Sequence, residues 1–392
     1  MRAQLTPEPS LTSSSAPRTA QRSHLVWSTA CLSAAALAVA APVLTGSSAF
    51  AAGSGTSTAG PTVSVVASGL ANPRGLAFGE HGSLVVALAG GGAHDSSVIL
   101  IPHAGWSAPG APVTLASGLA SVNDPHGAPP GVGTSGAVSV SVDNDHLYVQ
   151  MSLFAEAGDP QLGSLLSLGR GGALTTVANV GSFDFAWAAA HSGLSNQFPD
   201  ANPNAVLAVG GKKYVADAGA NTLDEVAASG RVKVLRFFGV PHGSVADSSV
   251  PTCLARGRDG SIFVGELLGG AYAPGGARVW KVTTDGGQYH ASVYATGLTT
   301  IQGCAVGADG ALYVTEFQTG GLDLSPTGNP SGDIVRIGRH GEVTPLNVPG
   351  LLWPSGLAAG ADGSLYTSNC SIAPATGFGP CVGGGQVVRV RP

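Results

Sequence analysis

Residues 298–316 read LTTIQGCAVGADGALYVTE, and this stretch decides the fold. Residues 303–307 form a short run of small and apolar side chains, and residues 311–315 are rich in strand-forming types. Between them lies Asp309-Gly310, a pair that readily takes the positive φ values of a tight turn. The stretch is therefore expected to form a β-hairpin that ends on a carboxylate, Glu316.

The same hairpin pattern recurs along the chain. Its turn residues are Gly82, Asp145, Gly211, Gly260, Gly310 and Gly363, and the last four are spaced 49, 50 and 53 residues apart. A period of about 50 residues built from short strands is typical of a β-propeller. Two further strand patterns accompany each hairpin. The sequence thus predicts an all-β fold, a six-bladed β-propeller with four-stranded blades, over residues 61–392.

The two ends of this region are expected to share one blade. The sixth unit stops at its third strand, near Arg391, whereas residues 62–70 match the pattern of a fourth strand. The N-terminal strand would then close the last blade. Closure of the ring removes sheet edges that would otherwise be open to aggregation.

Residues 1–51 have the features of a secretion signal peptide. Arg18 and Arg22 precede an alanine-rich apolar segment at residues 30–44, which is short for a membrane span, and Ala49-Phe50-Ala51 fits a cleavage site. We expect cleavage near Ala51, a flexible tail at residues 52–60 and a secreted, extracellular protein. No second apolar stretch is long enough to span a bilayer, so no transmembrane span is expected in the mature chain.

Charge and cysteine content narrow the class of protein. Only 10% of residues are charged and the formal net charge is -5, which argues against nucleic acid as a partner. A monomer is expected. Four cysteines follow the signal peptide, and an even number in an exported protein predicts disulfides. Cys370 and Cys381 bracket a short loop and should pair. Cys253 and Cys304 are expected at equivalent positions at the start of neighbouring inner strands, where either a bridge between blades or two buried thiols is compatible with the pattern.

The loops distinguish the two faces of the predicted ring. With the strands of a blade named A to D from the axis outwards, the A–B turns are short and the B–C and D–A connections are long. All long connections lie on one face, called here the long-loop face. Insertions gathered on one face of a repeat fold usually mark its binding surface. We expect this face to bind a protein, a glycan or a small ligand.

Polar residues end the B strands on the long-loop face. These residues are Asp217, Glu266, Glu316 and Asn369. Their oxygens could converge on Ca²⁺ or another divalent cation, or supply an acid and a base. Alternatively, each side chain caps backbone amides of its own loop or is simply solvated.

Three further residues are candidates on the same face. Tyr272 lies in the loop after Glu266 and is a candidate ligand contact. His126 and His242 lie in D–A loops and are candidate general bases. The sequence contains no hydrolase, phosphate-binding or dinucleotide motif, so catalysis is not the primary expectation. Residues 182–193 are the one predicted helix, expected to fill a gap between blades two and three or to cover the channel mouth.

Three segments resemble a known family. They are VPTCLARGRDGSIFVGELLGG (250–270), YATGLTTIQGCAVGADGALYVTE (294–316) and GGGQVVRV (383–390). They are similar to the ScyD/ScyE family of secreted bacterial β-propellers, and the resemblance covers about residues 62–392. It implies the propeller fold but no agreed catalytic residues.

The wider architecture is similar to NHL-repeat proteins and to gluconolactonase-like hydrolases, which hold a divalent metal at the channel mouth through Glu, Asn and Asp. Two functional hypotheses follow. The first is a secreted, non-catalytic binding scaffold that uses the long-loop face. The alternative is a divalent-metal-dependent hydrolase, such as a lactonase, with the B-strand carboxylates as its metal site.

Overall fold

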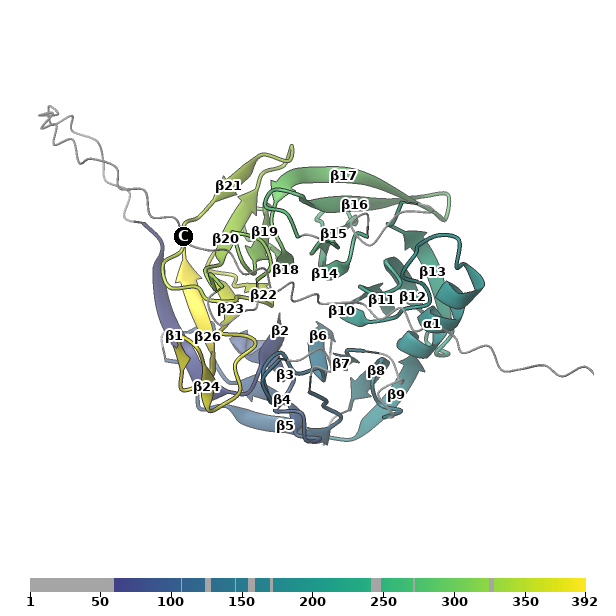
Figure 1. Cartoon of the computed structure of the whole chain (residues 1–392). Coiled ribbons are helices and arrows are strands. Elements are labelled where there is room, and N and C mark those ends of the chain that lie inside the picture. The colour runs from purple at the N-terminus through teal and green to yellow at the C-terminus, as the bar shows by residue number, and fades with distance from the viewer. Residues whose placement is uncertain are drawn as a thin grey trace, which may run out of the picture.

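The computed structural model describes residues 60–106, 108–123, 128–144, 146–153, 159–169, 172–240, 248–270, 272–323 and 328–392. Within these ranges the strands form six four-stranded antiparallel sheets, arranged as blades around a central axis (Figure 1). The predicted six-bladed β-propeller is therefore confirmed. The predicted signal peptide and most of the predicted tail lie outside the described residues.

The blades follow one another along the chain. The first comprises β2 (Pro73–Phe78), β3 (Leu84–Leu88), β4 (Ser96–Ile101) and β5 (Val113–Leu119), with the short 3-10 turn η1 (Glu80–Gly82) between β2 and β3. The second comprises β6 (Ala137–Asp143), β7 (His146–Met151), β8 (Ser164–Leu168) and β9 (Leu174–Asn179). The third comprises β10 (Pro203–Val209), β11 (Lys212–Asp217), β12 (Thr222–Val226) and β13 (Val232–Phe237).

The fourth blade comprises β14 (Pro251–Arg256), β15 (Ile262–Glu266), β16 (Ala277–Asp285) and β17 (Gln288–Leu298). The fifth comprises β18 (Ile301–Val306), β19 (Leu312–Glu316), β20 (Asp333–Ile337) and β21 (Val343–Pro345). The sixth comprises β22 (Leu357–Ala359), β23 (Leu365–Asn369), β26 (Gly385–Arg391) and, from the other end of the chain, β1 (Thr62–Leu70).

The sixth blade closes the ring as predicted. β1 runs antiparallel to β26, with Thr62 opposite Arg391 and Val63 opposite Val390. Figure 1 shows the purple first strand lying against the yellow last one. This pairing completes the sixth blade with a strand from the other end of the chain. The sixth blade also packs directly against β2 of the first blade, so both contacts close the ring.

Apolar side chains fill the spaces between blades. Val85 and Val98 of the first blade share one buried cluster with Val140 and Val149 of the second. Similar clusters join the other neighbouring blades. Burial of apolar surface on both faces of every blade stabilises the ring and holds the inner strands at fixed positions around the axis.

Two disulfides are present: the predicted Cys370–Cys381 pair and Cys253–Cys304, for which the sequence left either a bridge or two buried thiols open. Cys370–Cys381 brackets the small hairpin formed by β24 (Gly377–Phe378) and β25 (Cys381–Val382), and its Cα atoms are 5.7 Å apart. Cys253–Cys304 joins β14 to β18 of the next blade, also with Cα atoms 5.7 Å apart. The two cysteines are offset by one position rather than equivalent. Cys253 lies opposite Gly265, whereas Gly303, not Cys304, lies opposite the matching Thr315.

The helix α1 (Val180–Ala190) lies between the second and third blades, as one of the two predicted placements requires. It follows β9 directly, starts at an Asn179 cap and contacts β8 and β11. On the long-loop face, buried Val132, Phe317 and Trp353 pack with the Cys370–Cys381 hairpin in a separate apolar cluster. Among the described residues, no helix is long and apolar enough to cross a membrane.

Candidate functional site

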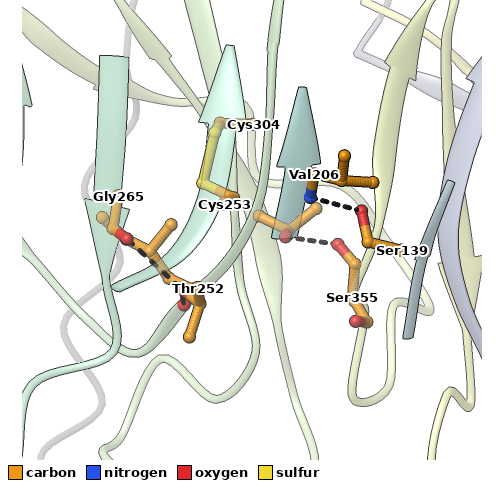
Figure 2. The surroundings of a disulfide bond; sticks show 9 residues. Ser139, Val206, Thr252, Cys253, Gly265, Cys304 and Ser355 are labelled. Atoms are coloured by element: carbon orange, nitrogen blue, oxygen red, sulfur yellow. Dashed lines mark hydrogen bonds between the residues drawn. A yellow bond between two sulfur atoms is a disulfide. The ribbon is translucent and has the colours of Figure 1, made fainter. Parts of the chain in front are cut away.

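A cavity of about 70 Å³ lies where the six inner strands meet. Every blade contributes to its wall. The lining residues include Gly75, Val138, Ser139, Asn204, Thr252, Gln302 and Ser355, together with Cys253 and Cys304. Figure 2 shows the disulfide of these two cysteines beside Ser139, Thr252 and Ser355. The disulfide thus ties two strands together at the wall of the cavity.

The same backbone irregularity recurs in the inner strands. Pairing skips one residue between Pro203 and Ala205, between Pro251 and Cys253, and between Ile301 and Gly303. β6 shows the same skip between Ala137 and Ser139, and β2 skips from Pro73 to Leu76. A β-bulge re-aims the side chain of its extra residue and is frequent next to functional sites. Here the skipped residues Val138, Asn204, Thr252 and Gln302 all line the cavity.

Some polar side chains of the cavity wall form hydrogen bonds to other described residues, and others do not. Ser139 Oγ accepts a hydrogen bond from the Val206 N–H at 3.2 Å (Figure 2), and Thr252 Oγ1 donates to the Ile301 carbonyl at 2.6 Å. These hydroxyls bind one blade to the next. In contrast, neither Asn204 nor Gln302 makes a side-chain hydrogen bond to any described residue, and both amides are only half-buried. They are therefore available to a ligand.

Arg74 is the charged residue nearest the cavity wall in sequence, because it directly precedes Gly75 in β2. Its Nη2 donates to the Thr134 carbonyl at 3.1 Å, in the loop that leads into β6. Burial lowers the pKa of Arg74 from 12.5 to about 10, and none of the described carboxylates lies within ion-pair distance to offset it. The sequence analysis did not select this residue.

The B-strand residues that were predicted to ring the channel are engaged within their own blades. Asp217 Oδ1 accepts the N–H groups of Asn202, Gly219 and Ala220 at 2.8–2.9 Å. Asn369 Oδ1 accepts the Leu352 N–H at 2.7 Å. Each side chain thus ties the loop entering its blade to the end of the B strand, which is the capping alternative left open by the sequence.

Glu316 belongs to the same pattern but carries an altered pKa. Its Oε1 accepts the Thr299 N–H at 2.8 Å. Burial is the main cause that raises the pKa of Glu316 to about 7; the Thr299 N–H opposes the rise by stabilising the carboxylate, and the negative charge of Asp333 adds to it. Since this carboxyl exchanges its proton near neutral pH, it has the property that a general acid or base requires.

Glu266 has the fullest set of partners. Its buried carboxylate forms an ion pair with Arg278 at 2.5 Å and accepts hydrogen bonds from Ser249 Oγ at 2.5 Å and Trp280 Nε1 at 2.9 Å. Arg278 also lies over the Trp280 ring. All partners belong to the fourth blade or to the loop entering it. These partners satisfy the buried Glu266 carboxylate, so its burial is explained without a bound metal ion.

Three predicted site residues remain: Tyr272, His126 and His242. Tyr272 is half-buried and packs on a cluster of Ala218, Val250 and Leu267, and burial raises its pKa. It therefore contacts the third and fourth blades rather than the cavity lining. His126 and His242 lie outside the described residues, so their role as general bases stays a prediction.

A group of buried acids that the sequence did not indicate joins α1 to the third blade. Asp184 of α1 is fully buried and lies within hydrogen-bonding reach of the Asp217 and Asp224 carboxyls. Burial and the neighbouring negative charges raise the pKa of Asp184, and burial raises those of Asp224 and of Asp217, the latter to about 6. The described residues contain no set of three or more His, Cys, Asp or Glu side chains placed to hold a metal ion. The raised pKa values favour protonated carboxyls, so we interpret these acids as sharing protons.

Comparison with known proteins places the fold but not the function. No protein-family model matches the chain, and no curated protein sequence matches it. Among solved structures, a protein assigned as an oxidoreductase (glucose dehydrogenase) from Thermus thermophilus shares 17% identity and a TM-score of 0.52, over 85% of this chain and 100% of that one.

Two further structures are similar at lower identity. A gluconolactonase from Xanthomonas campestris shares 11% identity and a TM-score of 0.50, over 84% of this chain and 89% of that one. A virginiamycin B lyase from Staphylococcus aureus shares 13% identity and a TM-score of 0.46, over 78% and 81%. At these identities the likeness extends to the β-propeller fold alone, a fold that hosts unrelated activities.

Proposed function

We propose that this chain is a secreted, non-catalytic binding propeller of the ScyD/ScyE type, which takes a small polar ligand where its axial channel opens on the long-loop face. The observation that carries the proposal is the pair of free amides, Asn204 and Gln302, in the wall of the axial cavity. An amide offers both donors and acceptors, and leaving it unpaired in an enclosed site is unfavourable unless a ligand or water satisfies it.

Other features support export and binding. Two disulfides are typical of proteins that fold in oxidising compartments. The apolar cluster around Trp353 and the Cys370–Cys381 hairpin gives the long loops a packed base. A rigid base lowers the entropy lost when loops bind a partner. A protein or glycan partner on this face stays a prediction.

Saturation-transfer NMR with glycolamide tests the proposal. This neutral molecule carries a hydroxyl and an amide group and has few enough heavy atoms for a cavity of about 70 Å³. We expect saturation transfer with the native chain and its loss in the double variant Asn204→Leu/Gln302→Leu, which removes both amides at similar volume. Binding that persists in the double variant places the ligand elsewhere and refutes the channel site.

A metal-dependent hydrolase is the second candidate, and one observation favours it. The pKa of Glu316, raised to about 7, is suited to acid–base chemistry at neutral pH. Thermal melting with EDTA and then with Ca²⁺, Mn²⁺ or Zn²⁺ tests this candidate. A cation at about a hundred times its dissociation constant stabilises by ~2.7 kcal/mol. A rise specific to one metal, lost in Glu316→Gln, supports the hydrolase; equal melting in all conditions rejects it.

A further inference from the structure

Arg74 differs from three other arginines of the propeller. Arg278, Arg336 and Arg389 each form an ion pair with a carboxylate of their own blade. The Arg74 guanidinium has a single hydrogen bond to the described residues, from Nη2 to the Thr134 carbonyl. A guanidinium carries several further N–H donors. Most of its hydrogen-bonding capacity is therefore unused.

The position of Arg74 is costly for a cation that has no carboxylate partner among the described residues. A charge that is enclosed by protein without a counterion loses hydration that nothing replaces. Burial lowers the pKa of the Arg74 guanidinium, which is the expected result of this loss of hydration. Yet the residue keeps partial exposure, so water and solutes still reach it. An anion from solution would supply the missing counterion.

The neighbours of Arg74 place its backbone at the edge of the axial cavity on the long-loop face. Gly75 and Leu76, the next residues of β2, line the cavity. The Arg74 carbonyl accepts a hydrogen bond from Ser368 Oγ at 2.9 Å, which fixes the backbone at this point. Thr134, whose carbonyl accepts the hydrogen bond from the Arg74 guanidinium, lies in the D–A connection that enters the second blade.

The chemistry of the surroundings defines the class of ligand. Among the described residues that line the cavity, none is charged, so a single positive charge from Arg74 matches a monoanion. The planar fork of a guanidinium matches a carboxylate. The amides of Asn204 and Gln302 match hydroxyl groups, since each can both donate and accept. We propose that the channel selects a small hydroxycarboxylate, with Arg74 binding the carboxylate and the two amides binding the hydroxyl-bearing part. This proposal rests on the function proposed above.

The test compares glycolate with glycolamide, two molecules of nearly equal size that differ in charge. Isothermal titration of the native chain should show glycolate binding about tenfold more tightly or better, the gain typical of a charged hydrogen-bonded pair. Arg74→Gln keeps a donor for Thr134 and removes the charge, so the preference should vanish. The matched control is Arg258→Gln, because Arg258 also donates to a backbone carbonyl but lies at the turns of the opposite face. This control should keep the preference.

Each outcome separates the two proposals. Equal affinity of the native chain for glycolate and glycolamide, or a preference that survives Arg74→Gln, overturns the hydroxycarboxylate inference while the binding function stands. The comparison of the two ligands on the native chain needs no variant and holds even if Arg74→Gln fails to fold. Binding of neither molecule refutes the channel as a ligand site altogether. Inorganic phosphate that binds more tightly than glycolate rejects a monoanionic carboxylate as the preferred ligand.

Discussion

Glu316→Gln should make the stability of this propeller less dependent on pH. The folded-state pKa of Glu316 is raised from 4.5 to about 7, because its carboxyl is buried beside Asp333. A raised carboxyl pKa means that the folded chain holds a proton that the unfolded chain releases. The stability associated with that proton is fully present below about pH 4.5 and is lost as the pH rises through about 7.

The size of the effect follows from the shift. One pKa unit corresponds to about 1.4 kcal/mol, so the change from 4.5 to about 7 sets an upper limit of about 3.5 kcal/mol. The Glu316 side chain keeps some exposure to water, which reduces this value, and about 2 kcal/mol is the working expectation. Glutamine resembles the protonated acid, and its Oε1 can still accept the Thr299 N–H. The variant should match the native chain at about pH 4.5 and exceed its stability by about 2 kcal/mol near pH 8.

Urea unfolding of both chains at several pH values, with disulfides intact, measures this difference. Other carboxyls with raised pKa values, such as Asp217, act equally in both chains and cancel. The matched control is Glu342→Gln, because Glu342 is exposed and its pKa is lowered by local N–H groups. The difference in unfolding free energy between Glu342→Gln and the native chain should stay constant above about pH 5.5. A constant difference for Glu316→Gln across the same range would refute the assigned burial and proton affinity of this carboxyl.

Three further predictions test other parts of the fold. Replacing Cys253 and Cys304 by serine should destabilise the propeller by about 4 kcal/mol, because the bond closes a loop with a sequence separation of 51; urea unfolding with unchanged stability would contradict the cross-link. Gly75→Ala should cost about 1–3 kcal/mol, since an added Cβ would meet backbone of the second blade at 2.7 Å, whereas Gly320→Ala, with open space around it, should leave the melting temperature unchanged. Asp184→Asn should raise stability at about pH 8, because an amide remains neutral and offers a donor to the neighbouring carboxyls; a less stable variant at that pH would show that the acid is needed in its charged form.

The repeat made the ring predictable from sequence. Each hairpin needs a turn with positive φ, and Gly260, Gly310 and Gly363 have φ values of 80–84° at equivalent positions. The conformation of such a turn is determined by a few neighbouring residues and can therefore be predicted from the sequence. The closing strand was predictable for a related reason, since residues 62–70 carry the pattern of the missing fourth strand.

The chemistry of the B-strand ends was less predictable. A carboxylate at a strand end can point to the axis or fold back onto its own loop, and sequence spacing is the same in both cases. The outcome depends on donors that lie elsewhere, such as the Arg278 and Trp280 side chains for Glu266. The acid group of Asp184, Asp217 and Asp224 likewise exists because α1 packs against the third blade. Its members therefore meet through tertiary packing.

Arg74 shows why the candidate site itself required the structure. In the repeat it occupies the position of Thr252 and Gln302, one residue after the first paired residue of the inner strand. In four other blades the residue at that position lines the cavity, and the bulge rather than the residue type determines this. Five of the blades share the irregularity, and at this position Val138, Asn204, Thr252 and Gln302, which line the cavity, are uncharged. Arg74 lies beside this neutral lining, so the proposed site carries its one positive charge on the side of the first blade. A ligand with one charged end and one neutral polar end would bind there in one orientation.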